Sequence, residues 1–185
     1  MLHMSKTKGG PYTPVMKIEK CETVEADYKS SHEDGTAETE YFVMTAVSKE
    51  GFESDYSNEV FFTFDYLPIE SAVNLSAELS GDEITFTWNQ GDIERVREWK
   101  LFYSETEGGP YEELSLIEYT GQPGPQYSTT STMTVQKGEK KTFYFVLVTF
   151  NILWVFSENS NEVSVTIDRT VPDPVYNFKL KVVAE

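Results

Sequence analysis

Two histidines, one cysteine and many carboxylates are the side chains of this sequence that could do acid–base, nucleophilic or metal chemistry. His3 and His32 lie far apart in the sequence, and neither is near a plausible nucleophile. A catalytic serine or cysteine needs a base that a third group positions, and no nucleophile elbow, phosphate loop or His/Cys ligand cluster occurs. Neighbouring carboxylates such as Glu112 and Glu113 point to opposite faces of a strand. The sequence therefore predicts no catalytic site, no metal site and no cofactor.

Charge and composition narrow the choice of partners. The chain of 185 residues carries 15 basic and 31 acidic side chains, for a net charge of −16. Such a field repels phosphate backbones and anionic membrane surfaces, so the sequence predicts no nucleic-acid partner. No stretch is long and apolar enough to insert into a membrane. The single cysteine, Cys21, allows no intrachain disulfide, and its acidic neighbours indicate a structural thiol.

A pattern occurs twice in the chain. Gly-Gly-Pro-Tyr at residues 9–12 returns at residues 108–111, 99 positions later. Ser-Asn-Glu-Val at residues 57–60 returns at residues 160–163, 103 positions later. A period near 100 residues matches the length of one small β-sandwich domain, so the chain is predicted to be a repeat of such domains.

The second copy shows the alternation of strands most clearly. Ile84, Phe86 and Trp88 share one face of a strand, and the run 143–150 is apolar on both faces, as expected for a central strand. Short strands with turn signals every 8–12 residues are typical of an antiparallel sandwich. The strands expected in this copy are 71–77, 83–88, 99–103, a shorter strand from 111, 143–150 and 161–167.

At this point the residues resemble a family. Trp88, the strand 99–103 and the closing Ser-Asn-Glu-Val look like a fibronectin type III domain of the bacterial or phage kind, and 41–47 begins the matching run in copy one. The resemblance implies an all-β fold of tandem fibronectin type III-like antiparallel β-sandwiches, the first lacking its N-terminal strands. One departure is that the family's corner tyrosine is replaced by Glu40 and Phe143 in the two copies.

The repeat predicts three segments. Residues 1–66 form a partial fibronectin type III-like domain that starts within its third strand, and residues 67–171 form a complete one. Residues 172–185 are the first strand of a further repeat or an intermolecular donor strand, because Asn177-Phe178 echoes Asn74-Leu75. Whether Met1 is a native start or the chain is a piece of a longer array stays open.

An apolar loop is the clearest difference between the copies. Where copy one has a charged turn at residues 49–53, copy two has five consecutive large apolar residues. A patch of this kind is typical of a contact surface. Either an interdomain contact or a site for a separate protein explains it. The loop residues are Ile152, Leu153, Trp154, Val155 and Phe156.

The end of the chain alternates as a strand does. Tyr176, Phe178, Leu180 and Val182 share one face, and such a strand invites pairing with another sheet. If this strand completes copy one of the next subunit, the head-to-tail contact does not close and builds a fibre. Alternatively, the next domain of an array or a different protein completes the two open ends.

These features favour a non-enzymatic structural and interaction module in an extracellular, cell-surface, filament or virion-tail assembly. Its expected partners are proteins: the same chain, as a homo-oligomer or fibre, or adjacent domains of a larger assembly. The alternative is that the chain provides spacer or accessory domains of a secreted polysaccharide-active enzyme or an adhesin, for which an exposed coplanar aromatic platform would be expected.

Overall fold

The computed structural model describes residues 1–19 and 27–181, and in it the chain divides into two compact units. Unit 1 comprises Met1–Ile69 together with Asn151–Val155, and unit 2 comprises Glu70–Phe150 together with Phe156–Glu185. The described elements are strands, apart from one short 3-10 helix, η1 (Ile93–Arg95). None of the described helices could span a membrane. Cys21 and Val182 lie outside the described residues.

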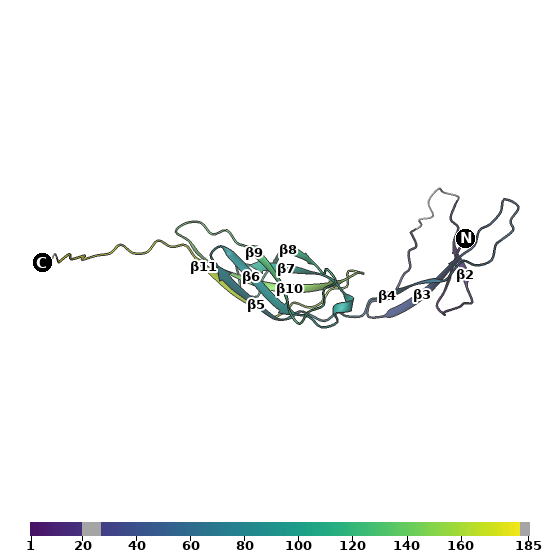
Figure 1. The fold of residues 1–185 in the computed structure, drawn as a ribbon, viewed down its shortest axis with the longest axis horizontal. Helices are drawn as coiled ribbons and strands as arrows, with labels where there is room; N and C mark the ends of the chain where they lie inside the picture. The colour runs from purple at the N-terminus through teal and green to yellow at the C-terminus, as the bar shows by residue number, and fades with distance from the viewer. Residues whose placement is uncertain (20–26, 182–185) are drawn as a thin grey trace. The chain divides into compact units, whose positions relative to one another are not determined.

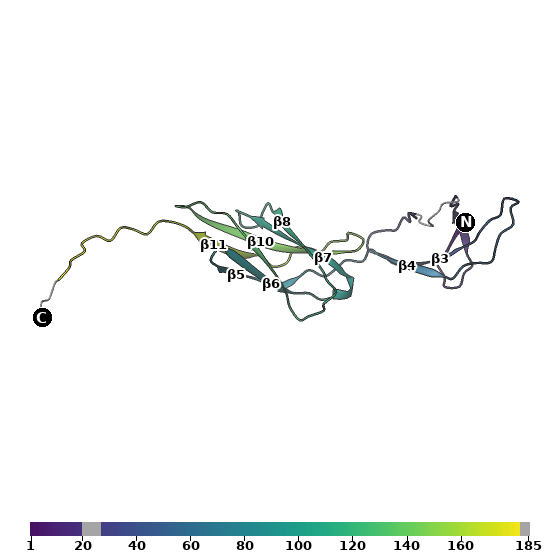
Figure 2. The same ribbon diagram turned by 45° about the horizontal axis from the view of Figure 1, so that its top comes forward.

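Unit 2 is a sandwich of two antiparallel sheets, with the strand orders β11-β10-β7-β8 and β5-β6-β9 (Figure 1, Figure 2). Its strands are β5 (Val73–Ser80), β6 (Glu83–Asn89), β7 (Val96–Ser104), β8 (Glu112–Glu118), β9 (Tyr127–Thr132), β10 (Lys140–Asn151) and β11 (Val163–Asp168). The strands expected at 83–88, 99–103 and 143–150 lie within β6, β7 and β10, whereas β9 was not predicted.

Aromatic side chains fill the space between these two sheets. Phe86 of β6 meets Phe145 of β10 edge to face at 4.9 Å, and Trp88 meets Trp99 in the same way at 5.3 Å. All four are buried, and the Trp99 ring N–H donates to Gln90 Oε1 at 3.0 Å. Edge-to-face pairs add stability beyond the area that they bury. The alternation in β6 therefore specifies which of its faces enters the core.

Unit 1 contains one described sheet, in the order β2-β1-β3-β4. Its strands are β1 (Leu2–Ser5), β2 (Thr13–Met16), β3 (Ala37–Met44) and β4 (Val60–Asp65). This order matches β8-β7-β10-β11 of unit 2 strand for strand. The face that corresponds to the core face of unit 2 is called the inner face below. The strand registers place on it Leu2, Met4, Glu38, Glu40, Phe42, Met44, Val60, Phe62 and Phe64.

The repeated motifs contact each other, which explains why they recur together. In unit 2, Glu162 of Ser-Asn-Glu-Val accepts hydrogen bonds from the backbone N–H of Gly108 (3.0 Å) and from the Tyr111 hydroxyl. In unit 1, Glu59 accepts the same two bonds from Gly9 N–H (2.8 Å) and from the tyrosine of its own Gly-Gly-Pro-Tyr turn. In each unit, this carboxylate thus links the Gly-Gly-Pro-Tyr turn to the last strand of the sheet. The turn follows β1 in unit 1 and β7 in unit 2, and the last strands are β4 and β11.

The pKa values of these groups follow from the same contacts. Burial, and then the hydrogen bond to Glu162, raises the pKa of Tyr111 to about 12. The Tyr12 hydroxyl and the Gly9 N–H lower the pKa of Glu59 from its ordinary value. Both shifts favour a neutral tyrosine that donates to an ionised carboxylate, which is the stronger, charge-assisted form of this bond.

The serine and the asparagine of the motif hold two further strands. Ser160 exchanges hydrogen bonds of 2.9 Å with the backbone of Leu147 in β10. Asn161 accepts from Leu75 N–H through Oδ1 and donates to Leu75 O through Nδ2, both at 2.9 Å, and so holds β5. In unit 1, the side chain of Asn58 is exposed and makes no hydrogen bond with any residue of 1–19 or 27–181.

This contrast generates a paired prediction. Asn161→Ala leaves both backbone groups of the buried Leu75 without their partner, so it should lower the free energy of unfolding by about 1–3 kcal/mol. Asn58→Ala should change it by less than about 0.5 kcal/mol. Urea denaturation followed by far-UV circular dichroism measures this, because that signal reports the strands of both units, whereas all three tryptophans follow residue 69. Equal effects of the two variants would contradict the assignment.

Candidate functional site: an uncovered sheet face and two exposed apolar segments

The inner face of unit 1 is only partly covered. Among residues 1–19 and 27–69, no second sheet lies over it. Val60 is 56% exposed and Phe62 is 40% exposed. Val165, the counterpart of Phe62 in unit 2, is buried. Aliphatic and aromatic side chains in this arrangement normally face another layer of structure. The exposed part of the inner face is therefore a candidate docking surface.

The segment 27–36 covers another part of the inner face. Tyr28 meets Phe42 edge to face at 5.1 Å, and His32 stacks on Phe64 at 4.2 Å. These contacts bury ring surface of the central strand β3 and of the far end of β4. The exposed remainder thus lies around Val60 and Phe62.

A polar cluster of His32, Glu38 and Glu40 lies under this segment. His32 Nδ1 is 3.4 Å from Glu38 Oε2, and His32 Nε2 is 3.6 Å from Glu40 Oε1. The side chains of His32 and Glu40 are each only 2% exposed. The Ser30 hydroxyl donates to Glu40 at 2.9 Å, and Lys6 donates to Glu38 at 2.7 Å, which lowers the pKa of Glu38. This cluster cannot be read from residue spacing, because a loop supplies His32 and the strand β3 supplies both glutamates.

The other histidine is not arranged for catalysis. His3 Nε2 lies 3.0 Å from Thr45 Oγ1 and 3.1 Å from Glu53 Oε1, and the Thr45 hydroxyl also donates to Glu53. Both partners therefore share one ring nitrogen, whereas a catalytic triad uses one nitrogen for the nucleophile and the other for the carboxylate. This group ties β1 to the turn after β3.

The apolar loop 152–156 is held by the residue that precedes it. The Asn151 side-chain oxygen accepts from the N–H groups of Leu153 (2.8 Å) and Val155 (3.0 Å). Ile152, Trp154 and Phe156 are exposed, and Leu153 and Val155 are half-buried. The side chains predicted as a contact surface are thus presented on an ordered turn.

Trp154 adopts a backbone conformation that a bulky residue rarely takes. Its φ is +63°, and the corresponding residue of copy one is Gly51, with φ +91°. Both turns close through the same backbone bonds, from the N–H of Gly51 to Ser48 O and from the N–H of Trp154 to Asn151 O. A left-handed non-glycine residue is strained and is found preferentially at functional positions. The conformation of this turn therefore gives no reason for a tryptophan at its left-handed position.

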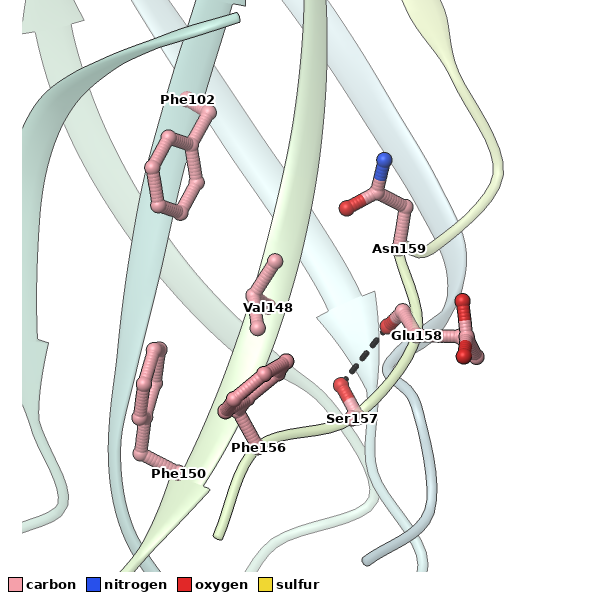
Figure 3. A pocket seen from close by; sticks show the side chains of 7 residues that line it. All are labelled: Phe102, Val148, Phe150, Phe156, Ser157, Glu158 and Asn159. Carbon is pink, nitrogen blue, oxygen red and sulfur yellow. Dashed lines mark hydrogen bonds between the residues drawn. The ribbon is translucent and has the colours of Figure 1, made fainter. Parts of the chain in front are cut away.

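Phe156 also borders a shallow groove on the outer face of β7 and β10 (Figure 3). The groove has a volume of about 370 Å³, and the Phe150 and Phe156 ring centres are 6.0 Å apart. The two ring planes are inclined by 39° to each other, so they do not form a coplanar platform. The groove is lined by Phe102, Val148, Phe150, Phe156, Ser157, Glu158 and Asn159.

The C-terminal segment, residues 172–181, forms no strand within this chain. Tyr176, Phe178 and Leu180 are each more than three-quarters exposed. Asn177 has a φ of +61°, and Asn74, its counterpart in the repeat, has a φ of +56° at the start of β5. The segment shares with β5 both its sequence and this unusual backbone feature, but it lacks a partner sheet among the described residues.

Comparison with known proteins supports the fold. No family model and no curated protein matches the chain. Among solved structures, the chicken CNTN1 FN1–FN3 domains match 89% of this chain and 52% of theirs, with 13% identity and a TM-score of 0.55. An Fn3-like protein from Clostridium thermocellum matches 52% of this chain and 90% of its own, with 22% identity and a TM-score of 0.39.

A β-1,2-glucanase from Parabacteroides distasonis matches 64% of this chain and 16% of its own, with 18% identity and a TM-score of 0.39. This chain thus spans about half of the chicken fragment and a small part of the glucanase. The fold is all-β and fibronectin type III-like. At these identities the comparisons bear on the fold alone.

The environment of Trp154 leads to a stability prediction. Trp154→Gly removes a large side chain but relieves a left-handed residue, so the free energy of unfolding should change by no more than about 1 kcal/mol. Trp99→Ala, in the core, should lower it by about 3–5 kcal/mol. Thermal and urea unfolding measure both. A loss for Trp154→Gly as large as that for Trp99→Ala would show that the loop is part of the core.

Proposed function

We propose that this chain is a non-catalytic structural module that assembles head to tail, with the C-terminal segment of one copy adding a strand to unit 1 of the next. The proposal rests on two apolar surfaces of this chain that are both exposed. An inner sheet face is exposed in unit 1, and an alternating apolar segment is exposed at residues 172–181. The segment and the sheet face are complementary in apolar surface, and the Asn58 side chain offers the segment the two hydrogen bonds that Asn161 makes with Leu75 in unit 2.

Unit 2 supplies the template for this contact. There β5 lies against β11, with Leu75 buried and its backbone bonded on both sides to Asn161. The corresponding residues of the proposed contact are Phe178 of one copy and Asn58 of another. Asn58 is exposed in unit 1, and Phe178 is 78% exposed. In this register Phe178 would cover the inner face as Leu75 does in unit 2.

The exposed part of the inner face lies where the donor strand is needed. In unit 2, β5 covers the β11 side of the sheet, and the corresponding strand of unit 1 is β4. Val60 and Phe62 of β4 are its exposed inner-face residues. The segment 27–36 already covers Phe42 and Phe64, so one added strand would bury much of the remainder.

The apolar loop is proposed as a second protein contact in the same assembly. Its exposed tryptophan and phenylalanine are residues typical of binding hot spots. The fibronectin type III-like fold fits an extracellular, cell-surface or virion-tail setting, which forms part of the proposal. The inclined rings of the groove do not favour the alternative of a carbohydrate-binding accessory domain.

Analytical ultracentrifugation of the full chain tests the assembly. The sedimentation coefficient should rise with concentration, and Phe178→Asp should abolish the rise by placing a charge at the buried position. Val171→Asp is the matched control, since Val171 is also exposed but precedes the segment; it should leave the rise unchanged. A wild-type chain that stays monomeric to millimolar concentration would disprove the proposal.

A synthetic peptide of residues 172–185 tests the register. The full-length Phe178→Asp variant, with a vacant acceptor face, should bind the labelled wild-type peptide in a saturable manner. Adding Asn58→Ala to this acceptor should weaken binding about tenfold, since two backbone bonds of the kind made by Asn161 are lost. Binding that is unaffected by Asn58→Ala would leave assembly intact but refute this register.

A further inference from the structure

The polar cluster of unit 1 occupies positions that are arranged differently in unit 2. The residues 103 positions after His32, Glu38 and Glu40 are a core valine, Val135, then a lysine and a core phenylalanine. The first and third positions are buried in both units, but in unit 1 they hold an imidazole and a carboxylate where unit 2 has two apolar side chains. Replacing core residues with ionisable ones is costly unless something compensates their charge.

At the position of Glu38, the two units carry opposite charges. In unit 2, Lys141 pairs with Glu105 at 2.8 Å; in unit 1, the same two positions hold Glu38 and Lys6, at 2.7 Å. Reversing the pair preserves a surface ion bridge. It also places a second carboxylate on the inner face, two residues from Glu40 and beside His32.

Buried ligand atoms in the cluster lack partners. His32 Nε2 and Glu40 Oε2 are buried, and neither has a hydrogen-bond partner among the residues that the structure describes. Both belong to side chains that are 98% shielded from solvent, as their 2% exposure shows. Buried polar atoms without partners are uncommon and call for a ligand or another explanation.

From this arrangement we infer that His32, Glu38 and Glu40 bind one divalent transition-metal ion of the Zn²⁺ class. Each residue offers a ligand atom within 4.8 Å of the other two. The 3.6 Å between His32 Nε2 and Glu40 Oε1 is close to the roughly 3.4 Å that separates two tetrahedral zinc ligands. The Glu38 carboxylate lies 3.4 Å from His32 Nδ1, and it would turn toward Nε2 to become the third ligand.

The chemistry of the donor set selects the ion. An imidazole nitrogen with carboxylates suits zinc and neighbouring transition metals, whereas Ca²⁺ and Mg²⁺ prefer oxygen ligands alone. A divalent ion also cancels the two negative charges of Glu38 and Glu40 when the imidazole is neutral. Such an ion would tie the segment 27–36 to β3, which is a role separate from the assembly proposed above.

Isothermal titration of the full chain with ZnCl2 tests the site. We expect one saturable site, which millimolar Mg²⁺ and Ca²⁺ do not displace although the chain has 31 acidic residues. His32→Val, which installs the residue of unit 2, and the near-isosteric Glu40→Gln should each weaken binding by at least about tenfold. Zn²⁺ should raise the thermal unfolding temperature of the wild type and not that of Glu40→Gln.

The second histidine provides the matched control. His3→Phe installs the residue that unit 2 has at the equivalent position, Phe102, and should leave zinc affinity unchanged. Circular dichroism establishes that each variant is folded, and Glu40→Gln keeps the test valid if His32→Val is not. The inference is overturned if the wild type shows no saturable zinc binding, or if binding is lost with His3→Phe and retained with Glu40→Gln.

Discussion

The hydrogen bonds of the Ser-Asn-Glu-Val motif are the constraint on which both units depend. In unit 2, Ser160 bonds to β10, Asn161 to β5 and Glu162 to the turn between β7 and β8. Three consecutive residues thus connect their own sheet to β5 of the opposing sheet. Each bond satisfies a backbone or hydroxyl group that would otherwise be costly to bury. Through these bonds the motif of unit 2 contacts β10, β5 and the turn that follows β7.

Unit 1 makes two of these three connections. Ser57 and Glu59 form the same bonds as their counterparts, and they hold a sheet with the strand order of unit 2. The third connection, through Asn58, lacks a strand among the described residues. The hydrogen bonds within this sheet thus form without a second sheet among the described residues. For this reason unit 1 keeps the strand order of unit 2 although part of its inner face is exposed.

Sequence alone predicted the elements whose apolar residues alternate, and missed those defined by contacts. Ile84, Phe86 and Trp88 identified β6, because alternation reports a strand with one buried face. The hydroxyl-rich β9 (Tyr127–Thr132) carries no such signal and depends on pairing with β6. The segment 175–181 alternates as well as β6 does but forms no strand, because a strand also needs a partner. The polar cluster was missed because His32 reaches Glu40 only through the path of the loop.

At two places the copies share a backbone conformation but carry very different side chains. The turn at Trp154 closes through the bond that closes the turn at Gly51, so its shape does not require the tryptophan. Likewise, the strand that carries Phe143 in unit 2 carries Glu40 in unit 1, at the same depth of burial. Folding alone does not explain a side chain that the shared backbone does not require and that adds strain or buried charge. A binding role supplies one, and for this reason the loop and the polar cluster, rather than the common core, carry the functional proposals.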